Sequence, residues 1–135
     1  MKPIFADTFY WVALFNKKDN WHQRVIELTS TLKNVEIVTT DEVLIEVLNF
    51  LSATVSLRGR TVQFVDDIMN NPHIQVIPQN RESFLQGLNL YRRRLDKKYS
   101  LTDCISMTVM KRLKINEVLT HDHHFKQEGF IILFE

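Results

Sequence analysis

Four acidic residues stand at points of the sequence where they could hold a divalent metal ion. Asp7 follows the apolar run IFA, Glu46 lies within TTDEVLIEVLNFL, Asp103 lies within SLTDCISM, and Asp122 follows VLTH. Carboxylates about 4 Å apart repel one another by on the order of 4 kcal/mol per pair at an effective dielectric of about 20. A bound cation would offset that repulsion, and a set of carboxylate oxygens favours Mg²⁺ or Mn²⁺ over zinc. If the fold brings the four together, they predict metal-dependent chemistry.

Three of these acids also have an ordinary structural explanation. Asp7 stands where a helix would begin, and aspartate is among the best N-cap residues. Asp122 follows a candidate strand and could be a plain loop acid. Ser100 and Asp103 have the spacing of a capping box, in which each side chain satisfies a backbone donor at the start of a helix. Capping and metal binding are compatible, so Asp103 is predicted to do both.

Glu46 lacks an explanation of this kind. The preceding pair, Thr39 and Glu42, has the spacing of a capping box and accounts for the start of the helix without Glu46. Glu46 lies one turn further along an apolar helix, four residues after Glu42, where two like charges repel each other. We therefore expect a group outside this helix to compensate the Glu46 charge.

The elements predicted around the acids alternate between strands and helices. Short apolar runs are candidate strands at 3–6, 35–38, 74–77, 118–119 and 131–134. Apolar residues recur with a helical period over 21–32, 61–69 and 84–95. This alternation predicts one α/β domain over residues 1–135, with a mostly parallel sheet and helices on both faces. Such sheets bind ligands at the carboxyl ends of their strands, where Asp7 and Asp122 stand.

The composition restricts the classes of function. Hydrophobic residues make up 44% and charged residues 24%, which is typical of a folded globular protein. The formal net charge of +1 gives no general basic surface, so any contact with nucleic acid must come from a local patch. Cys104 is the only cysteine, which excludes an internal disulfide and favours a reducing compartment. No apolar run approaches the roughly twenty residues of a membrane span, and a cytoplasmic location is expected.

In order and context, the four acids resemble the acidic positions of PIN-domain nucleases. The matching segments are IFADTFYWVALF, TTDEVLIEVLNFL, SLTDCISM and VLTHDHHF, and they extend across nearly the whole chain. The size and single-domain layout are similar to the toxins of VapBC-type toxin–antitoxin modules. The resemblance implies a PIN-like three-layer α/β/α fold, with a mostly parallel sheet of about five strands flanked by helices. It also implies a Mg²⁺- or Mn²⁺-dependent endoribonuclease acting on RNA.

The resemblance implies a role for each residue of the site. The residues that would bind metal directly or through water are Asp7, Asp103 and Asp122. Glu46 would hold a second metal ion or a water on the metal. The hydroxyls that would support these ligands or contact a phosphate are those of Thr8, Thr102 and Thr120. The metal would activate a water for in-line attack on a phosphodiester, without a covalent enzyme intermediate. A toxin of this kind also implies a cognate antitoxin that covers the acidic site, and a homodimer.

Two groups of side chains beside these motifs are open to more than one interpretation. Phosphate charge dominates affinity for RNA, and the candidate contacts are Arg58, Arg60, Arg93, Lys97 and Lys98. The same cations could simply be solvated residues at helix ends. Three histidines crowd the fourth acid, in a departure from the family pattern: His121, His123 and His124. We interpret them as a polar loop without a ligand role, although imidazoles could draw manganese or zinc into the site.

Other classes of enzyme lack part of their motif. A haloacid-dehalogenase-like phosphatase needs a second aspartate two residues after the first, and Phe9 stands there. An HD-type phosphohydrolase needs histidines on earlier helices, and His22 and His73 form no such pattern. Two alternatives stay open, a non-catalytic PIN-like RNA-binding domain and a stand-alone PIN nuclease without an antitoxin.

Overall fold

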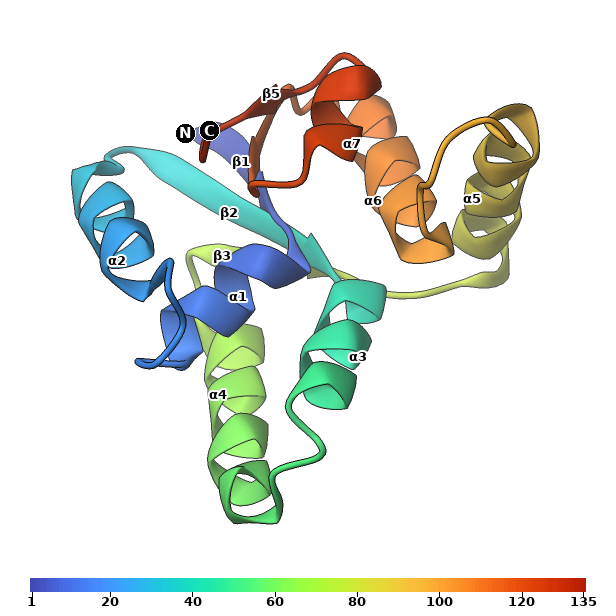
Figure 1. Cartoon of the computed structure of the whole chain (residues 1–135). Helices are drawn as coiled ribbons and strands as arrows, with labels where there is room; N and C mark the ends of the chain where they lie inside the picture. Colours follow the sequence, from blue (N-terminus) through green and yellow to red (C-terminus); the bar gives the residue numbers. More distant parts are fainter.

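A single parallel sheet runs through the computed structural model, which describes residues 1–135 (Figure 1). The strand order is β3-β2-β1-β4-β5, and every neighbouring pair is parallel. The strands are β1 (Lys2–Ala6), β2 (Val35–Thr40), β3 (Ile74–Ile77), β4 (Glu117–Leu119) and β5 (Ile131–Ile132). All five predicted strands are therefore confirmed. The last is shorter than the predicted 131–134, because the chain bends after Ile132 and the Phe134 carbonyl accepts a hydrogen bond from His121 Nδ1.

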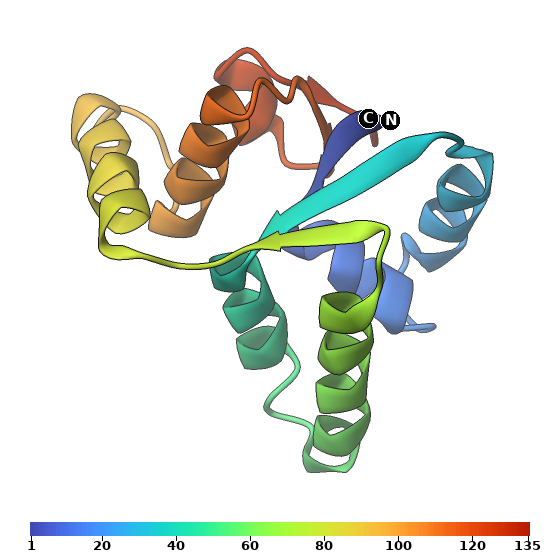
Figure 2. The ribbon, with the colours of Figure 1, turned by 180° about the vertical axis from the view of Figure 1, so that it is seen from behind.

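Helices cover both faces of this sheet. They are α1 (Thr8–Phe15), α2 (His22–Thr31), α3 (Asp41–Phe50), α4 (Arg58–Asn70), α5 (Arg81–Arg93), α6 (Leu101–Arg112) and α7 (His123–Gln127), with a short 3₁₀ turn at Val55–Leu57. Figures 1 and 2 show α1 to α4 on one side of the sheet and α5 to α7 on the other. The three-layer α/β/α prediction is confirmed. None of the helices is both long and apolar enough to cross a membrane.

The central strand is covered on both faces, which explains why its sequence is an unbroken apolar run. Ile4 and Phe5 of β1 are 2% and 0% exposed. Phe5 pairs with Val38 of β2 on one side and with Val118 of β4 on the other. The carboxyl ends of these three strands therefore meet at one edge of the sheet.

Helix ends differ from the prediction in two places. The predicted capping box of Thr39 and Glu42 is wrong. Strand β2 runs two residues further than predicted, and Thr40 is the N-cap, whose hydroxyl accepts from the amide of Val43 at 3.1 Å. The Thr39 hydroxyl instead donates to the Ala6 carbonyl at 2.9 Å, joining β2 to the end of β1. The helical stripe 84–95 also extends too far, since α5 ends at Arg93 and Leu95 is 76% exposed.

Two contacts position α6, the helix that carries Asp103. Gly87 of α5 lies so close to α6 that an added Cβ would stand 2.4 Å from Ile105 Cγ1. At the other end, the nearly buried carboxylate of Glu128 accepts hydrogen bonds from Arg94, Tyr99 and Lys111 at 2.9–3.1 Å. This cluster joins the segment before α6, the last turn of α6 and the end of α7.

Candidate metal centre at the sheet edge

The buried carboxylate of Asp7 lies at the end of β1, the central strand. Asp7 occupies the N-cap position of α1, but its side chain makes no capping hydrogen bond, so the capping explanation is wrong. Its Oδ2 instead accepts from Thr120 Oγ1 at 2.9 Å. The side chain is almost completely buried. The pKa of Asp7 is raised to about 7, first by this burial, next by the charge of Asp103 and to a lesser degree by that of Glu46. A carboxylate this costly to ionise is typical of a functional site.

Glu46 reaches the same edge from α3. The Thr8 hydroxyl, on the first residue of α1, donates to Glu46 Oε1 at 2.5 Å. This bond joins the second turn of α3 to the residue that follows Asp7. It is the compensating contact from outside the helix that the position of Glu46 leads us to expect. After burial and the charge of a neighbouring aspartate, the charge of Glu46 also raises the pKa of both Asp7 and Asp103, because like charges repel.

Asp103 has the capping role predicted for it. Its backbone amide donates to Ser100 Oγ at 3.0 Å, and its Oδ2 accepts from the Ser100 amide at 3.2 Å, which completes a capping box at the start of α6. Burial, and next the charge of Asp122, raise the pKa of Asp103 above its usual range. The capping bonds leave the other carboxylate oxygen, Oδ1, without a capping partner.

Asp122 is the N-cap of α7 and not merely a loop acid. Its Oδ1 accepts from the backbone amide of His124 at 2.9 Å. Its own amide donates to Thr120 Oγ1 at 3.1 Å, while the same hydroxyl donates to Asp7 Oδ2. The buried Thr120 therefore joins two of the acids. Thr102 is half-buried on the first turn of α6, beside Asp103.

One imidazole accompanies the acids. Asp103, Asp122 and His124 each offer one ligand atom, and these atoms all lie within 4.8 Å of one another. The set combines carboxylate oxygens with one nitrogen, which are donors that divalent cations accept. The mutual repulsion that raises the carboxylate pKa values is also what a bound cation would relieve. The residues present therefore fit a divalent metal ion.

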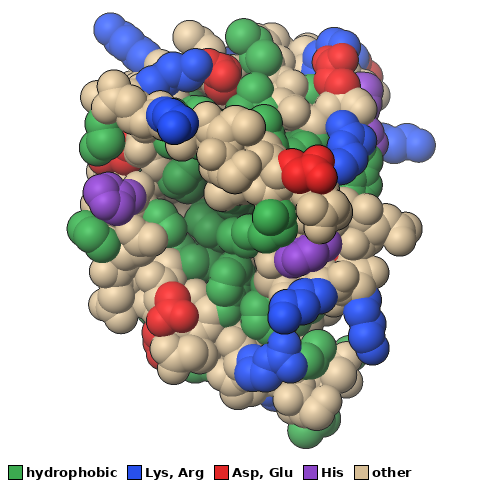
Figure 3. Space-filling view, turned by 90° about the vertical axis from the view of Figure 1, so that its left-hand side faces the viewer, with side chains coloured by type: hydrophobic (Ala, Val, Ile, Leu, Met, Phe, Trp, Pro, Cys, Tyr) green, Lys and Arg blue, Asp and Glu red, His purple; other side chains and the backbone are tan.

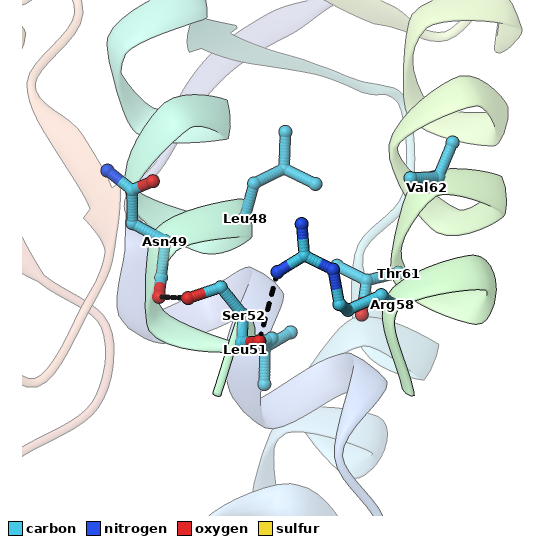
Figure 4. A pocket seen from close by; sticks show the side chains of 7 residues that line it. All are labelled: Leu48, Asn49, Leu51, Ser52, Arg58, Thr61 and Val62. Carbon is cyan, nitrogen blue, oxygen red and sulfur yellow. Dashed lines mark hydrogen bonds between the residues drawn. The ribbon is translucent and has the colours of Figure 1, made fainter. Parts of the chain in front are cut away.

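The basic residues proposed for RNA binding are spread over separate segments of the chain. Arg58 lies in a hollow of about 250 Å³ between α3 and α4, where it donates to the Ser52 carbonyl at 3.1 Å (Figure 4). Arg60 stacks over Phe15 at 5.7 Å. Arg93 lines a polar hollow between α5 and α6. The last two candidates, Lys97 and Lys98, are exposed in the segment before α6.

Two partly apolar hollows elsewhere on the molecule contain no carboxylate. The hollow in Figure 4 is lined by Leu48, Leu51 and Val62 among others. A second hollow, of about 310 Å³, opens on the face shown in Figure 3, between α1, α2 and the first residues of β2 and β3. The acids at the sheet edge are therefore the strongest candidate for a chemically active site.

The chain belongs to the PIN domain family, whose model matches residues 4–130. It is 25% identical over 128 residues, 95% of each chain, to the 23S rRNA-specific endonuclease VapC20 of Mycobacterium tuberculosis. The crystal structure of VapC20, described as a Sarcin-Ricin loop cleaving toxin, superposes with a TM-score of 0.85, at 24% identity over 95% of this chain and 96% of that one.

More distant structures share the fold. VapBC2 of Rickettsia felis, bound to a DNA fragment from its promoter, has a TM-score of 0.68 at 16% identity over 96% of each chain. A toxin–antitoxin complex from Klebsiella pneumoniae has a TM-score of 0.62 at 13% identity, covering 89% of this chain and 87% of that one. The predicted family and fold are both confirmed.

Proposed function

We propose that this protein is a metal-dependent endoribonuclease and the toxin of a toxin–antitoxin pair. The observation that carries the proposal is the convergence of Asp7, Glu46, Asp103 and Asp122 from four separate segments at one edge of the sheet. Burial and mutual charge raise the pKa of two of them, Asp7 and Asp103. Folding would not assemble such repulsion without a cation to offset it. Membership of the PIN family and the likeness to VapC20 supply the class of reaction.

Each residue of the site has a distinct part in this proposal. Asp103 and Asp122 would hold the metal ion, and Asp7 would join them as a carboxylate. The Thr120 hydroxyl orients Asp7, and the Thr8 hydroxyl orients Glu46, which would hold a second metal ion or a water on the metal. When bound, the ion supplies charge neutralisation on the phosphodiester and a more acidic water. We propose Mg²⁺ or Mn²⁺ as the ion, because most of the donors are carboxylate oxygens.

RNA and an antitoxin are the proposed partners. VapC20 acts on 23S rRNA, so ribosomal RNA is the first substrate to test. Toxin–antitoxin complexes among the structures of similar fold support an antitoxin partner. We also propose a homodimer. The apolar stripe of α3 is mostly used by the core, since Val43, Leu44 and Val47 are buried, but Ile45 and Phe50 of the same helix are 45% and 67% exposed.

The proposal is tested by incubating purified protein with total cellular RNA and intact ribosomes in Mg²⁺, Mn²⁺ or EDTA. Asp7→Asn and Asp103→Asn should abolish cleavage, and Asp103→Asn should stay folded because the amide oxygen can still accept from Ser100. Asp67→Asn is the matched control, because Asp67 is an exposed acid of α4 that bonds only Gln63.

Discrete fragments that require metal and disappear in both site variants would support the nuclease. RNA binding without cleavage by the folded wild type, under either metal, would instead favour the non-catalytic RNA-binding alternative. The stand-alone nuclease would be favoured by a third result. In that case the protein cleaves RNA, co-purifies with no antitoxin, and is not inhibited by the protein that the adjacent gene encodes.

A further inference from the structure

The three histidines around the fourth acid have different surroundings. His121 Nδ1 is hydrogen-bonded to the Phe134 carbonyl at 2.8 Å, and the ring stacks on Trp21 at 4.3 Å between centroids. His123 is exposed, and its ring meets the His121 ring at 5.5 Å between centroids. His124 alone faces the carboxylates. Its Nδ1 lies 3.2 Å from Asp122 Oδ1 and 3.4 Å from Asp103 Oδ2.

These separations match those of ligands that share one ion. Ligands about 2.1 Å from a metal ion lie roughly 3.0 Å apart at neighbouring octahedral positions and about 4.2 Å apart at opposite ones. The two contacts of His124 Nδ1 are close to the first value, and the whole set of three atoms spans 4.8 Å. A small adjustment of side chains is enough for all three atoms to bind the same ion.

The imidazole is also held in place. The backbone amide of His124 donates to Asp122 Oδ1, which fixes the first turn of α7 against the acid. The ring packs on Tyr99 at 5.4 Å between centroids, and the Tyr99 hydroxyl is bonded to Glu128 at 3.0 Å. With 28% of its side chain exposed, His124 is accessible to an ion without being free to swing away.

We propose that His124 is a metal ligand that makes this site prefer Mn²⁺, Co²⁺ or Zn²⁺ to Mg²⁺, in the same centre as Asp103 and Asp122. The inference rests on the proposed function and goes beyond it in naming the class of ion. Mg²⁺ takes almost only oxygen ligands, whereas imidazole nitrogen suits the later first-row ions. A carboxylate-only site gains affinity along that series as well, so the test must isolate the contribution of the nitrogen.

The experiment is calorimetric titration of Mg²⁺ and Co²⁺ into wild type, His124→Ala, His124→Asn and His123→Ala, together with the visible absorption spectrum of bound Co²⁺. The asparagine variant can place an oxygen near the Nδ1 position, and urea unfolding checks that each variant is folded. We expect both His124 variants to lose about tenfold or more in the ratio of Co²⁺ to Mg²⁺ affinity and to change the Co²⁺ spectrum. His123→Ala should match wild type.

Two results would overturn the inference, and they are distinguishable. If the His124 variants keep the wild-type ratio of affinities and the wild-type spectrum, His124 only hydrogen-bonds the acids, and the metal-dependent nuclease still stands. If wild type binds neither ion at millimolar concentration, both the ligand role of His124 and the proposed metal-dependent function are wrong.

Discussion

The Asp7→Asn substitution removes a charge that the fold holds at a considerable cost. The pKa of this carboxyl rises from 3.8 to about 7 in the folded protein, first because of burial and next because of the charge of Asp103. The folded state thus keeps the proton to a higher pH than the unfolded state does. In the metal-free protein, the contribution of Asp7 to stability is therefore lost as pH rises from about 4 to about 7. At about 1.36 kcal/mol per pH unit, ionisation of Asp7 costs roughly 1.5 kcal/mol at pH 5 and about 4 kcal/mol at pH 8.

Urea unfolding in EDTA at these two pH values measures the effect. The asparagine oxygen can still accept from Thr120, so the variant loses the charge and keeps the hydrogen bond. We expect its stability relative to wild type to increase by about 2–3 kcal/mol between pH 5 and pH 8. Added Mn²⁺ should then stabilise wild type more than the variant, which keeps Asp103 and Asp122 but lacks the third carboxylate. A stability difference that is the same at both pH values would refute the reasoning, because it would mean that Asp7 titrates alike in the folded and unfolded states.

Three further substitutions test the contacts that position the site. Gly87→Ala places a Cβ 2.4 Å from Ile105 Cγ1, so the free energy of unfolding in urea should fall by about 1–3 kcal/mol. Hydrogen bonds, chiefly from Arg94, lower the pKa of Glu128 to about 2. Wild type should therefore lose about 2–3 kcal/mol of stability as pH falls from about 4.5 to 2, and Glu128→Gln should not show this loss. Thr120→Val removes hydrogen bonds to two acids. It should lower the free energy of unfolding by about 2–3 kcal/mol and weaken metal binding in calorimetry. Thr120→Ser keeps the hydroxyl and should preserve both the stability and the metal affinity.

Each of these expectations has a result that contradicts it. An alanine at position 87 with wild-type stability would mean that Ile105 moves aside without cost. Acid unfolding of Glu128→Gln that parallels wild type would mean that other carboxylates cause the acid sensitivity. A Thr120→Val variant with wild-type metal affinity would mean that Asp7 is oriented by other contacts.

The strands and the acids could be predicted from sequence because both depend on local pattern. The unbroken apolar runs follow from coverage of the sheet on both faces, and acids directly after such runs stand at the carboxyl edge of a parallel sheet. The Ser100–Asp103 capping box involves residues three positions apart, and it is confirmed. Local spacing was sufficient in these cases.

Features that depend on register or on long-range contacts could not be predicted in this way. Which of two adjacent threonines caps α3 depends on where β2 ends, and Thr39 is held in the sheet by the Ala6 carbonyl. Arg94 meets Glu128 only because the chain returns 34 residues later, so no local pattern indicates this pair. The position of His124 over the acids depends on the turn that Asp122 caps.

The central claim is that these acids hold the metal ion on which RNA cleavage depends. Anomalous diffraction from crystals soaked in Mn²⁺ tests it most directly, because the ion can be located without reference to activity. The account predicts an anomalous peak within about 2.2 Å of carboxylate oxygens of Asp103 and Asp122, and its absence in Asp103→Asn crystals. Manganese bound only elsewhere, in crystals of a protein that cleaves RNA in Mn²⁺, would contradict it.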